Sequence, residues 1–376
     1  MHPDDYLDHA ATSWPKPQPV LDALTRWFTE LGVSADRGES DLSAQVRSEV
    51  HGVRQQLAGR LGTTAERVAF TSGATESLHL LFEALLRSGH HVVTTQIEHS
   101  SVARPLLASG RELTVTACDA TGRVDPADLV RNLESRPSRL LVVNHASNVT
   151  GAVQELTPAF ERARALGVVS ILDASQTLGQ IDVPRLDSPD GPDFLVASAH
   201  KSLLGPPGLG LIASRSDFSE ELSPPKPGGS GSSVALETHP AQWPALFESG
   251  TPNTPAILAL GAALDWSRTH ERRTNAEIIA DLDQFGRDLR DHCSNARVIT
   301  PTGRRIPVLS FSLPSLDPME ASMLATGIGL HLRTGFHCAP WIHRALDTDD
   351  AGTIRISLGP LQSARRLSEL ASALAH

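Results

Sequence analysis

Residues 193–210 read DFLVASAHKSLLGPPGLG, and this stretch decides the fold. The short apolar run 194–197 predicts a buried strand, and the glycines and prolines at 205–208 predict a turn. Between them lies Lys201. Lysine is rarely buried unless something pairs with it. The amine of Lys201 therefore either emerges into water as the strand ends or is kept inside for its chemistry, and this stretch alone leaves both interpretations open.

The same alternation of short apolar runs with amphipathic segments extends from residue 20 to residue 214. Strands that are apolar on both faces and alternate with helices indicate a mostly parallel sheet covered on both sides. We expect seven strands, within residues 67–73, 90–100, 112–119, 139–148, 168–176, 193–201 and 209–214. Helices are expected at 21–32, 42–62, 75–89, 125–135 and 157–167.

The second half of the chain predicts a smaller α+β domain. Residues 222–255 are rich in Pro, Gly and Ser and are typical of a connector, and residues 256–293 have a helical pattern. Strands are expected within 298–301, 307–313, 327–335 and 353–359, with a final helix at 361–375. We expect a large α/β domain at 20–258 and a small domain formed by 1–19 with 259–376.

Composition narrows the function classes. The chain has 376 residues and a net charge of −10, with Lys and Arg scattered, which argues against a nucleic-acid partner. No apolar run approaches the roughly 20 residues of a membrane span, and the polar N-terminus lacks the apolar core of a signal peptide. Three cysteines leave at least one free thiol, so a cytoplasmic location fits best. No metal site is expected.

Polar residues gather where the predicted strands end, which is where open α/β sheets bind ligands. Each has an ordinary explanation when taken alone: Ser72 or Thr75 and Asp173 as helix caps, and His99 as a surface histidine. Together they form a set that includes an acid, an amide, an imidazole, a hydroxyl and an amine. That set comprises Thr75, His99, Asn148, Asp173, Gln176, Ser198, His200 and Lys201.

This combination has a chemical meaning. A buried lysine amine can form a Schiff base with a carbonyl cofactor, and a carboxylate can keep a pyridine nitrogen protonated. The start of a helix can bind a phosphate, and a flat imidazole can lie against a ring. These are the requirements of pyridoxal 5′-phosphate (PLP). The set therefore favours Lys201 as the cofactor lysine, with Ser198 and His200 near the phosphate.

The chain resembles the class V aminotransferases, and within them the cysteine desulfurases of the Suf-type (type II) group, which have the PLP-dependent transferase fold type I. The resemblance covers nearly the whole chain. It rests on nine motifs in family order: YLDHAATSWPKP (6–17), SGATES (72–77), IEHSSVARP (97–105), SNVTG (147–151), LDASQ (172–176), SAHKSLLGPPG (198–208), FESGTPNTP (247–255), RTGFHCAP (333–340) and GTIRISLG (352–359).

The resemblance implies a role for each matching position. Lys201 would hold PLP and move the proton, and Asp173 would pair with the ring nitrogen. Gln176 would bond the phenolic oxygen, and His99 would stack on the ring. The implied phosphate ligands are Ala74, Thr75, Ser198 and His200, with Thr251 reaching the phosphate of a partner subunit in a homodimer. The implied substrate ligands are Asn148, Arg333, Arg355 and Arg37.

Cys338 is the implied nucleophile. Arg333, His337 and His343 are close in sequence, and positive neighbours make a thiol more reactive. The implied reaction converts L-cysteine to L-alanine, leaves a persulfide on Cys338, and passes the sulfur to an acceptor thiol. We expect Cys118 and Cys293 to be apolar fillers.

The sequence departs from the family at two places. Residues 37–43 read RGESDLS, with Ser40 where histidine is usual, and FHC (336–338) replaces the frequent HHC. Substrate choice and partner therefore stay open, as does the destination of the sulfur, which includes iron–sulfur assembly. Two alternatives also remain: another PLP reaction on this fold (selenocysteine lyase, β-lyase, aminotransferase or epimerase), or a scaffold without activity.

Overall fold

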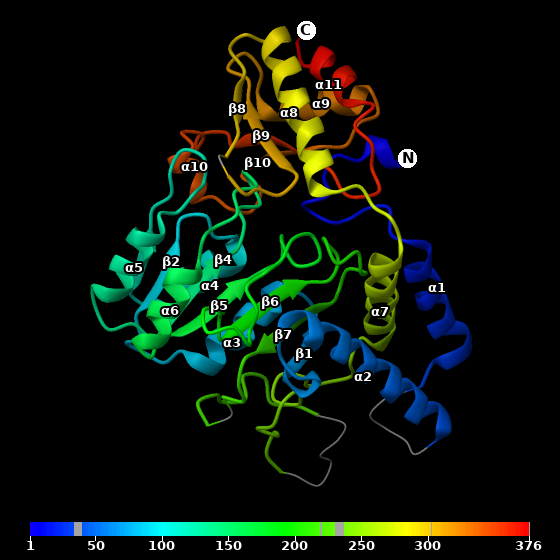
Figure 1. Ribbon diagram of the computed structural model, residues 1–376, viewed down its shortest axis with the longest axis vertical. Coiled ribbons are helices and arrows are strands. Elements are labelled where there is room, and N and C mark those ends of the chain that lie inside the picture. Colours follow the sequence, from blue (N-terminus) through cyan, green and yellow to red (C-terminus); the bar gives the residue numbers. More distant parts are fainter. Residues whose placement is uncertain (34–39, 219, 230–236, 302, 376) are drawn as a thin grey trace.

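A computed structural model describes residues 1–33, 40–218, 220–229, 237–301 and 303–375. Its larger sheet has seven strands in the order β1-β7-β6-β5-β4-β2-β3 (Figure 1). Strands β6, β5, β4, β2 and β3 run parallel, and β7 is antiparallel to both of its neighbours, so the predicted mostly parallel sheet is confirmed. The strands are β1 (Val68–Thr71), β2 (Val92–Thr95), β3 (Leu113–Thr116), β4 (Leu140–Asn144), β5 (Val169–Asp173), β6 (Phe194–Ser198) and β7 (Gly210–Ser214).

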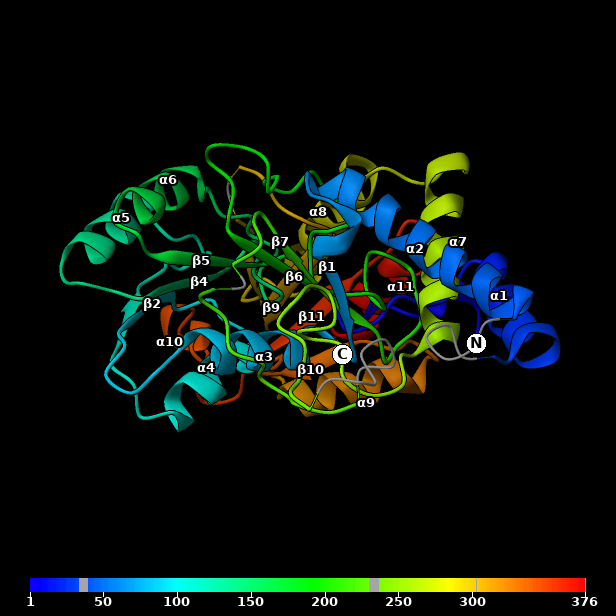
Figure 2. The same ribbon diagram turned by 90° about the horizontal axis from the view of Figure 1, so that it is seen from below.

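Helices cover both faces of this sheet. Because successive side chains of a strand point to opposite faces, Leu195 packs with one set of helices and Val196 with the other. The first set is α2 (Asp41–Leu61), α5 (Pro126–Glu134), α6 (Thr157–Ala165) and α7 (Thr254–Thr269), and the second is α3 (Ala74–Leu85) and α4 (Ser100–Ala108). Figure 2 shows α1 (Gln18–Arg26), α2 and α7 together at one end of the molecule, and α5 with α6 at the other.

The smaller sheet is antiparallel, in the order β10-β11-β9-β8. Its strands are β8 (Arg297–Ile299), β9 (Val308–Ser312), β10 (Arg333–Gly335) and β11 (Thr353–Ser357). Helices α8 (Asn275–His292), α9 (Pro318–Gly327) and α11 (Leu367–Ala373) share its core, and α10 (Ile342–Ala345) follows β10. The smaller α+β unit is therefore confirmed.

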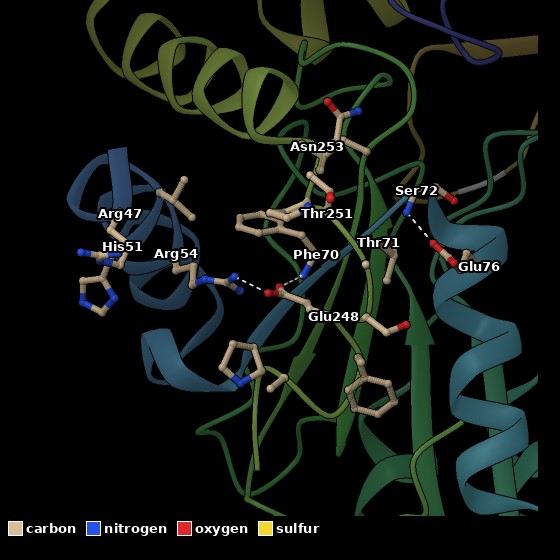
Figure 3. A pocket seen from close by; sticks show the side chains of 18 of the residues that line it. Arg47, His51, Arg54, Phe70, Thr71, Ser72, Glu76, Glu248, Thr251 and Asn253 are labelled. Atoms are coloured by element: carbon tan, nitrogen blue, oxygen red, sulfur yellow. Dashed lines mark hydrogen bonds and ion pairs between the residues drawn. The ribbon is translucent and has the colours of Figure 1, made fainter. Parts of the chain in front are cut away.

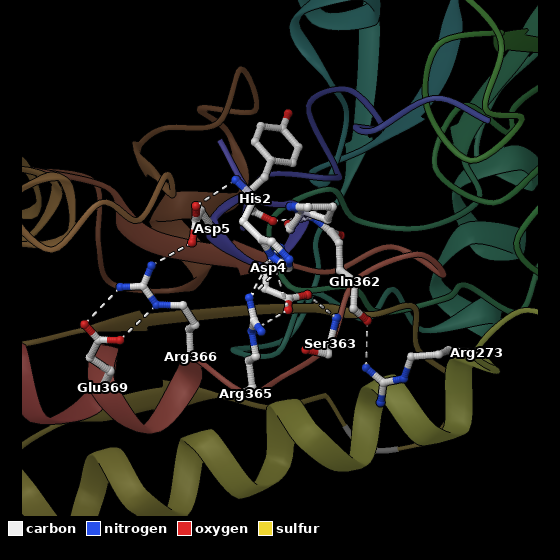
Figure 4. A network of polar contacts seen from close by, with 11 residues as sticks. His2, Asp4, Asp5, Arg273, Gln362, Ser363, Arg365, Arg366 and Glu369 are labelled. Atoms are coloured by element: carbon white, nitrogen blue, oxygen red, sulfur yellow. Dashed lines mark hydrogen bonds and ion pairs between the residues drawn. The ribbon is translucent and has the colours of Figure 1, made fainter. Parts of the chain in front are cut away.

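The N-terminal segment is held by the small unit. Tyr6 and Asp8 form bridges to His331 and Ser357. Figure 4 shows ion pairs that tie this segment to the end of the chain, with 2.6 Å between Arg366 Nη1 and Asp5 Oδ1. The division of the chain at residues 19 and 258 stays a prediction, and residue 258 lies inside α7.

Three differences from the predicted elements concern helices of nine residues or more. Residues 256–293 form two helices instead of one helical stretch, because Thr274 and Glu277 form a capping box that starts α8. Helix α9 was not predicted, although Asp317 begins it with a similar capping box. Helix α4 was also missed; it contains Pro105, which weakens a helical pattern.

Candidate active site

A cavity of about 190 Å³ lies beyond the carboxyl ends of β4, β5 and β6. It is closed by the start of α3 and by the loop after β10. Most of the predicted site residues line it, although they come from distant parts of the chain. The predicted residues in this cavity are Ala74, Thr75, His99, Asn148, Asp173, Gln176, Ser198, His200, Lys201, Arg333, Cys338 and Arg355.

One predicted residue that the structure describes is not part of this cavity. Thr251 is exposed and lines a separate cavity of about 810 Å³ between α2 and the connector before α7 (Figure 3). There Glu248 accepts hydrogen bonds of 2.6 Å from Arg54 Nη2 and from the backbone N–H of Phe70. Arg37 lies outside the described residues.

The start of α3 has the features of an anion-binding cradle. Its N-cap residue is Gly73, which offers no capping side chain, and Ala74 donates its N–H to Ser198 Oγ at 3.2 Å. A Cβ at Gly210 would lie 2.4 Å from the carbonyl carbon of Gly73, so glycine there lets β7 approach this turn closely. The free N–H groups of a helix start favour a bound phosphate.

Hydrogen bonds orient the side chains of Asp173 and His99 next to this cradle. Asp173 is buried at the end of β5, and its Oδ1 accepts a 2.9 Å hydrogen bond from Ser175 N. His99 Nδ1 accepts from Ser101 N at 3.1 Å, which leaves the ring proton on Nε2. Burial, and secondly the charge of Lys201, lower the pKa of His99 to about 4, so its ring is neutral at pH 7.

Lys201 is half-buried at the cavity wall. Burial lowers the pKa of its amine, and Asp173 acts in the opposite direction. A lowered lysine pKa increases the share of neutral amine, which is the nucleophilic and proton-accepting form. Of the two interpretations of Lys201, the structure favours an amine kept inside for its chemistry.

Arg355 and Asn148 meet in the wall of the same cavity. Arg355 is only 1% exposed, and it donates through Nη1 to the Asn148 carbonyl at 2.9 Å and through Nη2 to Asp8 Oδ1. Among the described residues, Arg355 Nε and Asn148 Oδ1 have no partner. Because buried polar atoms without partners are costly, these two atoms are candidates for hydrogen bonds to a polar ligand.

Cys338 is exposed on a preorganised loop. His337 and Cys338 both have left-handed backbones, with φ of +49° and +58°. Asn148 Nδ2 donates to the His337 carbonyl at 2.6 Å, and Ser100 N donates to the Cys338 carbonyl at 2.7 Å. These bonds hold the thiol at the edge of the cavity.

Only one of the three expected positive neighbours acts on this thiol. Arg333 Nη2 lies 3.3 Å from Cys338 Sγ. His337 Nε2 instead contacts Thr353, and His343 Nδ1 contacts Thr348. Burial lowers the pKa of both histidines, so they are neutral at pH 7, and of the three residues near Cys338 in sequence only Arg333 brings a positive charge to the sulfur.

Sequence reasoning missed several residues that complete the wall. Ala10 and Ala11 belong to the first quoted motif, and the motif itself was the available signal. Asn144 ends β4, which is the position that marked Asp173 on β5. The missed lining residues are Ala10, Ala11, Ser101, Asn144, Ser175 and His337.

Within the described ranges, no helix is both long and apolar enough to cross a bilayer. The same residues hold no group of three or more His, Cys, Asp or Glu side chains arranged to bind a metal. Cys118 and Cys293 are half-buried against the apolar cores, as expected of fillers.

Known proteins resemble this chain along nearly its whole length. The family model for aminotransferase class-V matches residues 5–370. A probable cysteine desulfurase of Vibrio cholerae is 30% identical over 98% of this chain and 92% of its own. One from Methanothermobacter thermautotrophicus is 30% identical over 94% and 89%.

Solved structures agree with these relatives. The apo cysteine desulfurase of Thermococcus onnurineus NA1 superposes with a TM-score of 0.88 at 25% identity, over 98% of this chain and 93% of that one. The cysteine desulfurase CsdA of Escherichia coli shares the fold, with a TM-score of 0.82 at 24% identity over 99% and 94%. With the family model, these likenesses confirm the resemblance drawn from the nine motifs, and the chain therefore belongs to the class V aminotransferases, among their cysteine desulfurases.

Proposed function

We propose that this chain is a PLP-dependent cysteine desulfurase that converts L-cysteine to L-alanine and carries the sulfur on Cys338. The observation that carries the proposal is that Lys201, Asp173 and Cys338 line one cavity. No other combination of predicted residues brings an amine, a carboxylate and an exposed thiol together in this way.

The residues present fit PLP. The cradle at Ala74 and Thr75, with Ser198 and His200, suits its phosphate, and the buried Asp173 carboxylate suits its ring nitrogen. The neutral ring of His99 can lie against the pyridine, and Gln176 can bond the phenolic oxygen. When bound to Lys201, PLP supplies an electron sink for the carbon that loses its proton.

The chain's own residues would then bind the substrate and move its proton. Arg355 and Asn148 offer their unpartnered atoms to the carboxylate of L-cysteine, which suits a guanidinium fork. Arg333 would contribute a second positive charge, and Arg37 is proposed only from its motif. The Lys201 amine would take the α-proton and later return a proton to the product.

Cys338 would carry out the sulfur transfer. Its thiolate, with Arg333 Nη2 3.3 Å from the sulfur, attacks the sulfur of the substrate. A sulfur–sulfur bond forms, the carbon–sulfur bond of the substrate breaks, and the electron pair left on carbon takes up a proton to give alanine. The outer sulfur of the persulfide then moves to an acceptor thiol, so no external oxidant is needed for the first half of the reaction.

Further parts of the proposal rest on the motifs. Thr251 is exposed beside a large cavity, which is compatible with its reaching the phosphate of a partner in a homodimer. An acceptor protein, the Suf-type subgroup, a role in iron–sulfur assembly and a cytoplasmic location are proposed on the same basis. All three cysteines are free, which fits a reducing compartment.

The test is the release of alanine from L-cysteine by PLP-loaded protein with excess reductant. Wild type should form alanine and sulfide in equal amounts, and Cys338→Ala should form neither while keeping its bound PLP. Cys118→Ala removes a half-buried thiol elsewhere and should behave as wild type. If wild type forms no alanine, or Cys338→Ala forms as much, another amino-acid substrate on the same PLP site becomes the leading hypothesis.

A further inference from the structure

Two adjoining cavities lie next to the segment that follows Lys201. They have volumes of about 710 Å³ and 390 Å³ and share Gly179, Gln180 and Arg272 in their walls. A Cβ at Gly179 would lie 2.7 Å from the carbonyl oxygen of Ser202, so this wall packs directly against the lysine segment. We call the two cavities together the arginine cleft. Its cationic lining residues are Arg60, Arg185, Arg272, Arg273 and Arg304.

Much of this positive charge is not balanced by carboxylates. Arg185 pairs with Asp187, and Arg273 pairs with Asp281. The other three arginines, Arg60, Arg272 and Arg304, form no ion pair with any described residue. Of the described residues that line the cleft, Asp182 alone carries a carboxylate. The chain as a whole has a net charge of −10, so this concentration of cations is local.

Two of the unpaired guanidinium groups also form only long hydrogen bonds to backbone carbonyls within the described residues. Arg60 Nη2 reaches the Leu264 carbonyl at 3.3 Å, and Arg304 Nη2 reaches that of Asp182 at 3.4 Å. Burial, followed by the charges of Arg272 and Arg268, lowers the pKa of Arg60, and Asp265 acts in the opposite direction, so repulsion between cations outweighs this one carboxylate. Such a cluster raises the free energy of the folded protein unless an anion neutralises it.

A buried histidine adds an independent observation. His9 lines the smaller cavity and is only 5% exposed. Both of its ring nitrogens lack a partner among the described residues, although buried polar atoms are almost always hydrogen-bonded. A ligand in the cleft would offer His9 the acceptor that the protein does not provide.

We propose that the arginine cleft binds a small anion that carries phosphate groups, with Arg60, Arg272 and Arg304 as charged donors and His9 as a buried donor. Several guanidiniums at one place suit a phosphate, which presents three oxygens, better than a single carboxylate. The two adjoining cavities, which share Arg272 in their walls, favour an anion with two charged groups. The start of α8 does not compete for it, because Thr274 and Glu277 already bond each other's N–H groups there.

The test is calorimetric titration of the PLP-loaded protein with pyrophosphate, at constant ionic strength in a phosphate-free buffer. Loading with PLP keeps the cradle at α3 occupied. Wild type should bind one pyrophosphate, and Arg272→Gln should weaken binding at least about tenfold, the usual effect of losing a charged hydrogen-bond donor. Arg287→Gln removes an exposed charge on α8, where Arg287 contacts Gln284, and should leave the affinity unchanged.

A second variant keeps the test decisive if Arg272→Gln folds poorly. Arg304→Gln should weaken binding in the same way, with folding of each variant checked by circular dichroism. The proposal would be overturned by the absence of saturable binding to wild type, or by an unchanged affinity in both cleft variants. Tighter binding of succinate than of pyrophosphate would overturn the assignment to phosphate.

Discussion

Replacing His9 by asparagine should flatten the dependence of stability on pH. Burial, and secondly the charge of Lys16, lower the pKa of His9 in the folded protein to about 3, against about 6.5 in the unfolded chain. Below pH 6.5 the unfolded chain therefore takes up a proton that the folded protein does not. Because the unfolded state then binds more protons, the free energy of unfolding falls as the pH falls from 6.5 towards 3.

The size of this effect follows from the two pKa values. Between pH 7.5 and pH 5, protonation of an unfolded histidine favours unfolding by a factor of about 30, or about 2 kcal/mol. The 5% exposure of His9 justifies using the full shift. His145 is also buried, and burial lowers its pKa to about 4, so it contributes a similar amount in wild type and variant. Only the difference between wild type and variant isolates His9.

The assay is urea unfolding of wild type and His9→Asn at pH values from 7.5 to 5, in buffers free of phosphate because His9 lines the arginine cleft. The smaller asparagine changes packing at every pH, so the informative quantity is how the difference in free energy of unfolding between wild type and variant changes with pH. That difference should move by about 2 kcal/mol in favour of the variant on going to pH 5. His292→Asn, an exposed site on α8, should show no such change. A difference that stays constant with pH for His9→Asn would refute the reasoning.

Three further changes test other parts of the site. Burial raises the pKa of Glu98 in the folded protein to about 8, so the free energy of unfolding falls as the pH rises above 4.5, where the unfolded chain loses this proton first. In urea unfolding, the neutral isostere Glu98→Gln should therefore gain about 3 kcal/mol relative to wild type between pH 5 and 7.5. Parallel pH profiles of the two proteins would contradict this. Asp8→Asn leaves the guanidinium of Arg355 without its carboxylate and should lower the free energy of unfolding by about 2 kcal/mol. This loss is smaller than for a fully buried ion pair because Asp8 is 18% exposed. A loss below about 0.5 kcal/mol would show that the pair matters little. Arg333→Gln removes the only described cation that contacts Cys338 Sγ and should slow its alkylation by iodoacetamide severalfold at pH 7; an unchanged rate would exclude an electrostatic role for Arg333.

The large sheet could be predicted because its strands are covered on both faces and therefore read as short apolar runs. The helical boundaries that were missed depend on weaker signals. The break between α7 and α8 depends on the capping box that Thr274 forms with Glu277. The spacing of apolar residues does not reveal such a capping box. Helix α4 is nine residues long and is stabilised by packing of Val102 and Leu106 in the core of the sheet, a contribution that local propensity does not include.

The grouping of the site followed from topology, whereas its charge states did not. Parallel strands present their carboxyl ends at one edge, so residues after β4, β5 and β6 had to converge wherever the sheet formed. Whether a neighbouring histidine carries a charge depends on the partners that tertiary packing supplies. His337 is adjacent to Cys338 in sequence, but its ring is buried against Thr353 and is neutral, while the more distant Arg333 reaches the sulfur across the turn. Sequence proximity therefore indicated the loop that carries the proposed nucleophile but not the groups around its sulfur, because a left-handed turn at two successive residues separates side chains that the sequence places side by side.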